Sequence, residues 1–325
     1  MITWLPQLIY YQFVIVLILA FYTILLLHLR KHQKQRDTRI LIHYNELLAT
    51  ALIENLPQSK VLESWKIKKG TSKHLREAMV SQIKMMSGEE KKYLLSLYEA
   101  FGYKTLDIRQ CKSVFWTKRL DAVIHLGLLE SADLAELFSA LMKDRAVLVS
   151  IAATISLSHL KHPLNSPELL HHLPESILSR SNALFEVVTN LGITHGIDPL
   201  TRAIRETNKP KIASACIQAL LFIRTLEATD ALHSLLKSPQ DLTVSTVRQI
   251  IRTLGQIGDP ASIGFVRPYL GHPSEILIAE SALLLILLQD PESLERIKQM
   301  KSSSSVEVRR ALKMFDAYEQ RVANE

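Results

Sequence analysis

The hydrophobic residues of this chain follow two patterns along its length. An uninterrupted apolar run of 20 residues occupies positions 8–27 (LIYYQFVIVLILAFYTILLL) and holds no charged side chain. After residue 39, apolar residues recur mostly every three or four positions, which is the spacing of one face of an α-helix. With 10 glycines and 12 prolines in 325 residues, the chain favours long helices over turn-rich β structure. The sequence therefore predicts an all-α protein.

The run at positions 8–27 is predicted to be a membrane-spanning helix. At about 1.5 Å per residue, it covers the roughly 30 Å hydrocarbon layer of a bilayer. A cleavable signal peptide has a basic N-terminal region, a shorter apolar core and a cleavage site of small residues. Residues 1–7 hold no Lys or Arg, and basic residues begin at Arg30, after the run. We therefore expect an uncleaved anchor over residues 1–29.

The distribution of charge predicts the topology of this anchor. The net charge is +4 over residues 30–39, +6 over residues 40–119 and −3 over residues 120–325, for a total of +7. By the positive-inside rule, residues 30–325 lie in the cytoplasm and the N-terminus faces outward. Contact with anionic lipid explains the basic segment better than nucleic-acid binding, because residues 120–325 have no basic stripe. Five residues are expected to contact the membrane surface: Arg30, Lys31, Lys34, Arg36 and Arg39.

An internal repeat runs through the C-terminal two thirds of the chain. Its first recurring feature, called the first column, is a pair of residues at the end of each predicted helix, an apolar residue followed by a mostly small one. The second residues of successive pairs lie 31, 34, 32, 31 and 31 residues apart. These pairs are Leu126-Gly127, Leu157-Ser158, Leu191-Gly192, Ile223-Arg224, Leu254-Gly255 and Leu285-Ile286. A second column of predicted turns begins at Asp198, Asp230, Asp259 and Asp290, spaced 32, 29 and 31 residues apart. A shared period of this length predicts stacked units, each covering the apolar face of the next.

The clearest unit lies at residues 247–273 (VRQIIRTLGQIGDPASIGFVRPYLGHP). Its first half places Val247, Ile250, Ile251, Leu254 and Ile257 on one helical face. We expect Asp259 to cap a second helix with Pro260 at its first position, Ile263, Val266 and Leu270 on its apolar face and Gly271 at its end. The unit is thus predicted to be a helix hairpin whose two apolar faces need neighbours.

The motif V-R…L-G-x-I-G-D-P in this unit resembles the short HEAT-like repeats of about 30 residues, also known as PBS-lyase-type repeats. The resemblance covers residues 117–325 and implies an α-solenoid of HEAT-like helix hairpins. The stretch from Leu97 to Leu126, with Gly102-Tyr103 and then Phe115-Trp116-Thr117-Lys118-Arg119, is similar to bacterial membrane-anchored HEAT-repeat proteins. That resemblance implies association with membrane-bound glycosyltransferases of polysaccharide synthesis.

These patterns divide the chain into four segments. We expect a transmembrane anchor at 1–29, a basic juxtamembrane segment at 30–39, a helical membrane-proximal region at 40–116 and the repeat solenoid at 117–325. In the third segment, Ser87-Gly88-Glu89-Glu90 predicts a helix start with a capping box.

Signatures of catalysis are missing from the sequence. It contains no Gly-rich phosphate loop, HExxH, GxSxG or DxD motif. Cys111 and Cys216 stand far apart without a metal-ligand neighbour, which favours buried free thiols. The strongest metal candidate is a histidine-rich stretch at His159, His162, His171 and His172, but two prolines interrupt it and no acidic partner lies nearby, so a solvated loop is favoured. We therefore predict no catalytic residue, no metal and no cofactor.

Three residues are candidates for contact with a partner: Trp116, Arg248 and Arg252. Exposed aromatic and arginine side chains are enriched at interfaces. The alternatives are core packing for Trp116 and its neighbour Phe115, and pairing with a neighbouring repeat or exposure to solvent for the two arginines, which lie one helical turn apart.

We therefore predict a membrane-tethered scaffold or adaptor at the cytoplasmic face of the inner membrane, which binds a membrane-associated protein and is not an enzyme. Two alternatives stay open. One is a HEAT-like lyase-type enzyme, related to the proteins that attach phycobilin chromophores, and the other is a sensor that binds a small ligand between repeats.

Overall fold

The computed structural model describes residues 5–65, 72–162, 167–170, 172–300 and 306–322. All regular secondary structure in these ranges is helical, which confirms the predicted all-α class. The chain divides into two compact units, Met1–Gln110 and Cys111–Glu325, and each is described by itself.

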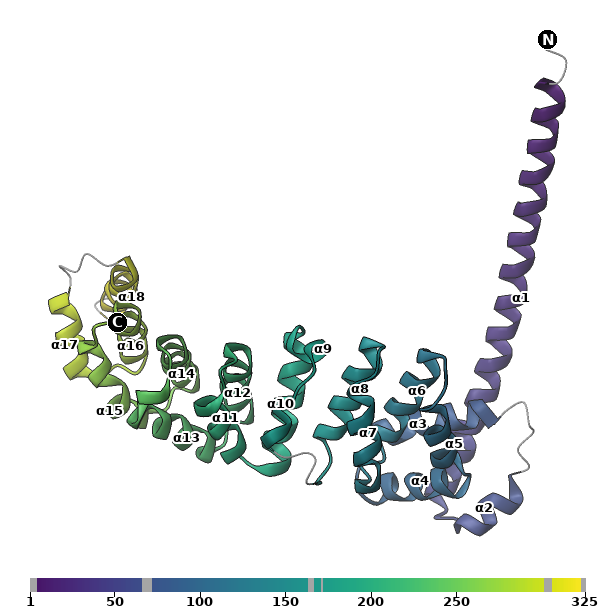
Figure 1. The fold of residues 1–325 in the computed structure, drawn as a ribbon, viewed down its shortest axis with the longest axis horizontal. Coiled ribbons are helices and arrows are strands. Elements are labelled where there is room, and N and C mark those ends of the chain that lie inside the picture. Colours follow the sequence, from purple (N-terminus) through teal and green to yellow (C-terminus); the bar gives the residue numbers. More distant parts are fainter. Residues whose placement is uncertain (1–4, 66–71, 163–166, 171, 301–305, 323–325) are drawn as a thin grey trace. The chain divides into compact units, whose positions relative to one another are not determined.

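In the residues that the structure describes, the first unit has one long helix and four shorter ones, which Figure 1 labels. Its elements are α1 (Leu5–Ile53), α2 (Gln58–Ser64), α3 (Ser72–Met85), α4 (Gly88–Ala100) and α5 (Tyr103–Gln110). Helix α1 packs on α3, α3 packs on α4, and α4 contacts both α2 and α5. The predicted juxtamembrane segment at 30–39 is therefore part of one continuous helix and not a separate element.

Helix α1 changes character along its length. Most of its large apolar side chains between Ile15 and Leu29 are exposed, Phe21 by 69%. Farther along, Tyr44, Leu48 and Ala51 are buried on one face, at helical spacing. Within the described residues, this is the one helix that is long and apolar enough to cross a bilayer, and its apolar part is 0% buried.

A buried polar cluster joins three helices of the first unit. Arg76 Nη1 on α3 donates to Asp107 Oδ1 on α5 over 2.7 Å, and the Tyr98 hydroxyl on α4 donates to the other carboxylate oxygen. Burial raises the pKa of Tyr98, and the Asp107 charge raises it further. The hydroxyl therefore stays a hydrogen-bond donor to Asp107.

The second unit contains two rows of helices (Figure 1). Within the described ranges, seven helices form the first row, called the A row, and each packs on the next. They are α6 (Trp116–Gly127), α8 (Val147–Ser158), α10 (Ser181–His195), α12 (Pro210–Ile223), α14 (Val244–Ile257), α16 (Glu275–Leu287) and α18 (Val306–Val322).

The helices and turns that connect them form the B row. They are α7 (Ala135–Leu141), the 3₁₀ turn η2 (Pro167–Leu170), α11 (Asp198–Glu206), α13 (Leu226–Lys237), α15 (Ile263–Val266) and α17 (Pro291–Gln299). The short helix α9 (Glu175–Leu178) contacts α8 and α10. Within the B row, η2 contacts α11, α11 contacts α13 and α13 contacts α15, just as successive helices of the A row contact each other. Stacked helix pairs of this kind form an α-solenoid.

Close packing between neighbouring A helices explains the first sequence column. A Cβ atom added to Gly192 would lie 2.8 Å from the Ile223 side chain on the next A helix. At Gly255 the corresponding distance to Leu284 is 3.7 Å, and Gly127 faces Ser156 in the same way. Arg224 differs, because it follows the end of α12 with a left-handed φ of 50° and makes the helix cap.

The second column is only partly a column of caps. Asp259 accepts a hydrogen bond from the Ala261 amide and is a cap, as predicted. The single helix expected after it is wrong, because the 3₁₀ turn η4 (Pro260–Ser262), the short helix α15 and the 3₁₀ turn η5 (Arg267–Gly271) follow instead. Asp290 caps α17 in the same way. The prediction of a turn at Asp230 is wrong, because this residue lies inside α13, whose cap is Thr225. The capping box at Ser87 is also wrong: α4 begins after it, but its side chain makes no cap hydrogen bond.

Candidate protein-binding surface

Two predicted contact residues on α14, Arg248 and Arg252, share one carboxylate on the neighbouring helix α16. Arg248 Nε lies 2.9 Å from Glu280 Oε2, and Arg252 Nε lies 2.7 Å from Glu280 Oε1. The Glu280 side chain is 8% exposed, whereas the arginine side chains are 44% and 54% exposed. The two arginines therefore join adjacent repeats and still present an excess positive charge to solvent.

A polar groove runs beside these arginines across α10, α12 and α14. It consists of two hollows of about 280 and 350 Å³ that share Gln218, Ser245 and Gln249 in their linings. We call it the A-row groove. Its basic residues are Lys211, Arg248 and Arg252, and none of the described residues that line it is an Asp or a Glu. The groove is thus electrostatically suited to an acidic occupant.

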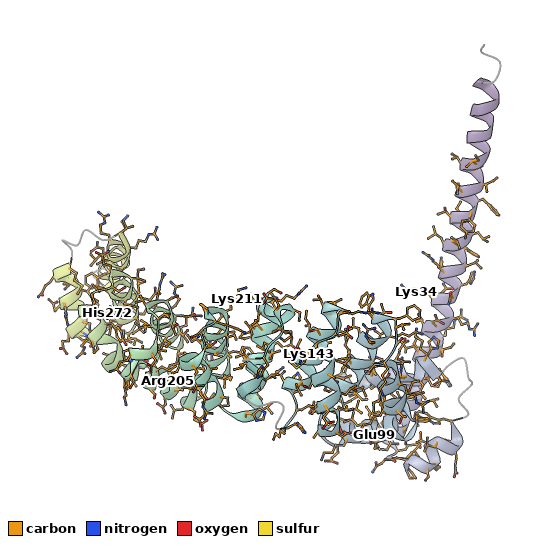
Figure 2. All side chains as sticks on the ribbon, in the orientation of Figure 1. Lys34, Glu99, Lys143, Arg205, Lys211 and His272 are labelled. Carbon is orange, nitrogen blue, oxygen red and sulfur yellow. The ribbon has the colours of Figure 1, made fainter. Side chains whose placement is uncertain are left out.

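Hydrogen bonds hold parts of this groove in place. Gln249 Nε2 donates to Ser214 Oγ over 2.8 Å, which links α14 to α12. Lys211 Nζ lies 3.3 Å from the carbonyl oxygen of Leu178. Figure 2 shows Lys211 on the side of the A row, opposite Arg205 on the B row. The amide and hydroxyl groups of the lining are both donors and acceptors, as main-chain recognition of a peptide requires.

Aromatic residues at the start of α6 are exposed. Phe115 is 61% exposed and Trp116 is 46% exposed, so neither belongs to the core. The next A helix, α8, begins with Val147 and Leu148, which are also exposed. Because α6 and α8 are successive A helices joined through α7, they run in the same direction and begin at the same edge (Figure 1). These four side chains are called the apolar edge.

The five basic residues expected at the membrane surface all lie on α1 and are exposed. Lys34 is labelled on this helix in Figure 2. Asp37, which lies among them, approaches His74 of α3 at 3.2 Å. The basic positions are thus free to face solvent or lipid headgroups.

The structure brings no metal ligands together in the residues it describes. His159 Nε2 lies 3.1 Å from the amide nitrogen of Asn190, and His171 lies outside the described residues. Cys111 and Cys216 are buried and are not joined in a disulfide. Burial raises the pKa of Cys216 to about 12, which disfavours the reactive thiolate at neutral pH.

Sequence reasoning identified the arginines but missed their acceptor and the groove. Glu280 is the one charged residue in the strongly apolar run at 276–287 (ILIAESALLLIL). A single carboxylate in such a segment indicates a buried, paired charge, because unpaired burial is costly. Gln218, Ser245 and Gln249 carried no comparable signal, since polar residues on a predicted helix normally face solvent.

No protein-family model matches the sequence, and no curated protein matches it. Among solved structures, it is similar to human deoxyhypusine hydroxylase in complex with glycerol, with 16% identity, a TM-score of 0.33 and coverage of 77% of this chain and 99% of that one. The complex of CpcE and CpcF of phycocyanin lyase from Nostoc has 20% identity, a TM-score of 0.29 and coverage of 64% and 74%. An engineered protein has 13% identity, a TM-score of 0.33 and coverage of 78% and 76%.

Proposed function

We propose that this protein is a membrane-tethered scaffold that binds a membrane-associated partner protein through its helical repeats. The A-row groove is the observation that carries the proposal. It combines exposed arginine charge, hydrogen-bonding side chains and a lining without carboxylates. These features favour a partner with an extended, acidic segment.

The apolar edge adds a second contact area. Trp116 and Phe115 are the kind of exposed aromatic residues that bury large area at an interface. An interface that used the edge and the groove together would combine an apolar anchor with charge complementarity.

The exposed apolar part of α1 supports the tether. A bilayer would cover side chains such as Phe21 and Ile24, which nothing in the described structure buries. The basic residues beyond it favour an orientation with residues 30–325 in the cytoplasm. Confinement to a membrane raises the effective concentration of a membrane-bound partner, so a modest intrinsic affinity is sufficient.

The family resemblance supports a more specific form of the proposal. In bacterial membrane-anchored HEAT-repeat proteins, the partner is often a membrane glycosyltransferase of polysaccharide synthesis. We extend this to a location in the bacterial inner membrane and to a partner of that class. That the protein is not an enzyme stays a prediction.

Affinity purification from native membranes in mild detergent tests the proposal. The full-length chain is compared with its Arg252→Glu variant, and co-purifying proteins are identified by mass spectrometry. A membrane protein retained by the wild type and lost from the variant supports the scaffold. If the same proteins are retained by both forms, the groove is not the binding surface; if neither form retains one, the scaffold proposal fails.

A further inference from the structure

A separate hollow, distinct from the A-row groove, lies where α13 ends and the following repeat begins. Its volume is about 520 Å³, and it shares no lining residue with the groove. It is bounded by the 3₁₀ turn η3 (Pro239–Asp241), the start of α14, the turn η5 (Arg267–Gly271) and α16. Its apolar walls include Leu236, Leu242, Val247, Phe265, Tyr269 and Leu277.

We propose that this pocket binds a small amphiphilic molecule with an aromatic or short aliphatic body and a single anionic group. Pockets for small ligands are predominantly apolar, contain a few placed polar groups and measure about 300–1,000 Å³. The volume and the lining of this pocket satisfy these criteria.

Contacts behind the walls hold the pocket open. The Tyr269 hydroxyl donates to the Leu236 carbonyl oxygen over 3.2 Å and so bridges two sides. Phe265 stacks on His233 with ring centroids 4.2 Å apart, and His233 lies 2.9 Å from the hydroxyl of Ser262. The aromatic walls are therefore fixed before a ligand arrives, which lowers the entropic cost of binding.

The polar groups of the pocket are suited to an anion. Lys237 Nζ lies 5.1 Å from the centre of the Phe265 ring, at the pocket wall. His272, labelled in Figure 2, accepts the amide proton of Ser274 on Nδ1 over 3.0 Å. Because Nδ1 accepts this bond, the ring N–H lies on Nε2, which is a second donor. Gln240 is the third polar residue, and the lining holds no carboxylate.

The charge of the lining also limits the charge of the ligand. The lining holds one ammonium group, that of Lys237, which has no carboxylate partner among the ion pairs of the described residues. It therefore matches a ligand with one negative charge. The rings of Phe265 and Tyr269 in the pocket wall favour a ligand with a flat body. A carboxylate or sulfonate on an aromatic ring system has this chemistry.

Fluorescence titration of the full-length protein in lipid nanodiscs tests the proposal, with 2-naphthoate as the probe. Its neutral analogue 2-naphthamide is the matched ligand, and empty nanodiscs correct for partition into lipid. We expect 2-naphthoate to bind about five- to tenfold more tightly, because a charge-assisted hydrogen bond adds to the same apolar contact. Equal affinities, or no saturable binding of 2-naphthoate, would overturn the proposal.

Two variants locate the binding. Lys237→Gln should reduce 2-naphthoate affinity to that of 2-naphthamide and leave 2-naphthamide affinity unchanged, whereas Lys143→Gln, on an exposed lysine elsewhere, should change neither. Gly264→Leu should abolish binding of both probes, because a Cβ atom at this lining residue enters open space and the larger side chain fills the pocket. Its circular dichroism should match that of the wild type. A folded Gly264→Leu protein that still binds 2-naphthoate would show that the probe lies elsewhere.

Discussion

Arg252 and Glu280 are joined by two hydrogen bonds between adjacent A helices, from Nε to Oε1 over 2.7 Å and from Nη2 to Oε2 over 3.2 Å. Arg248 donates a third bond to the same carboxylate. One buried negative charge is thus surrounded by two arginines that are half exposed. The contact holds two repeats together and leaves part of its positive charge available to a binding partner.

Arg252→Ala should weaken retention of the partner at the A-row groove. Arg248 still pairs with Glu280 in this variant, so the repeat contact is not left without a cation. We expect a loss of affinity of about fivefold or more, because a partly exposed charge at an interface contributes modestly. Pull-down of the co-purifying protein at graded salt concentrations measures it. Arg202→Ala, on an exposed arginine of α11, is the control; equal losses in both variants would contradict a role for the groove.

Glu280→Gln should act in the opposite direction on binding. The change removes the one carboxylate that both arginines contact, so the groove becomes more positive by one charge. An acidic partner should then bind more tightly at low salt. Thermal denaturation should show a loss of about 1–2 kcal/mol in unfolding free energy, since charge-assisted hydrogen bonds become neutral ones. Weaker partner binding by a folded Glu280→Gln protein would contradict an acidic partner.

Alanine at two glycines of the repeat column should have opposite effects on stability. At Gly255 the new Cβ meets Leu284 at 3.7 Å, an ordinary contact, so Gly255→Ala should stabilise α14 by up to about 1 kcal/mol. At Gly192 it meets Ile223 and Leu200 at 2.8 Å, so Gly192→Ala should cost about 1–3 kcal/mol through overpacking. Denaturant unfolding of both variants gives the comparison. A stabilised Gly192→Ala protein would show that the A helices are less tightly packed there.

The pair Arg119–Asp144 predicts a pH dependence of stability. Arg119 donates to both carboxylate oxygens at 2.8 Å, and Asp144 also accepts the Ala146 amide proton. The hydrogen bond from Arg119 lowers the pKa of Asp144 below its ordinary value of 3.8. A carboxyl group whose folded pKa is lowered stabilises the fold above its unfolded pKa, and this contribution is lost as pH falls through the folded pKa.

Asp144→Asn should therefore destabilise the protein at pH 7, and the difference from the wild type should shrink below about pH 4. Thermal melts at pH 7, 5 and 3 measure it. Asp121→Asn, at an exposed position on the same helix as Arg119, is the comparison. If the difference in stability between Asp144→Asn and the wild type stays constant with pH, the charge of Asp144 does not contribute to it.

Removal of residues 1–29 should release the chain from membranes. The cut falls inside α1 but leaves the buried face at Tyr44, Leu48 and Ala51, so the first unit keeps its contact with α3. Carbonate extraction and sedimentation should move the fragment to the soluble fraction, and circular dichroism should stay helical. A fragment that sediments with membranes would place the attachment in the basic segment or beyond; a disordered one would contradict the repeat fold.

The periodic part of the fold was predictable because packing repeats itself. Gly192 and Gly255 mark where one A helix touches the next, so the spacing of the column to which they belong gives the length of one repeat in residues. The turn at Asp230 was mispredicted because α13 begins earlier, at the Thr225 cap, and the local preference of Asp for turns did not decide the helix start.

The sites were less predictable than the fold. Arg248 and Arg252 could be singled out from their spacing, but their shared acceptor Glu280 lies 32 and 28 residues away. The pocket beside Lys237 depends on the positions of two turns that carry no periodic signal. Which surface polar residues converge is set by the rotation of one repeat against the next, and a single sequence does not specify that rotation.

Because α1 is one continuous helix, the orientation of its exposed apolar part relative to its buried face is fixed. No glycine or proline interrupts it between residues 7 and 53, and it runs unbroken from the exposed apolar part to the buried face at Tyr44. In a tethered chain, such a helix sets the height and the rotational phase of the first unit above the bilayer. Each residue inserted before Tyr44 would raise that unit by about 1.5 Å and turn it by about 100°, whereas seven would restore nearly the same facing at a greater height.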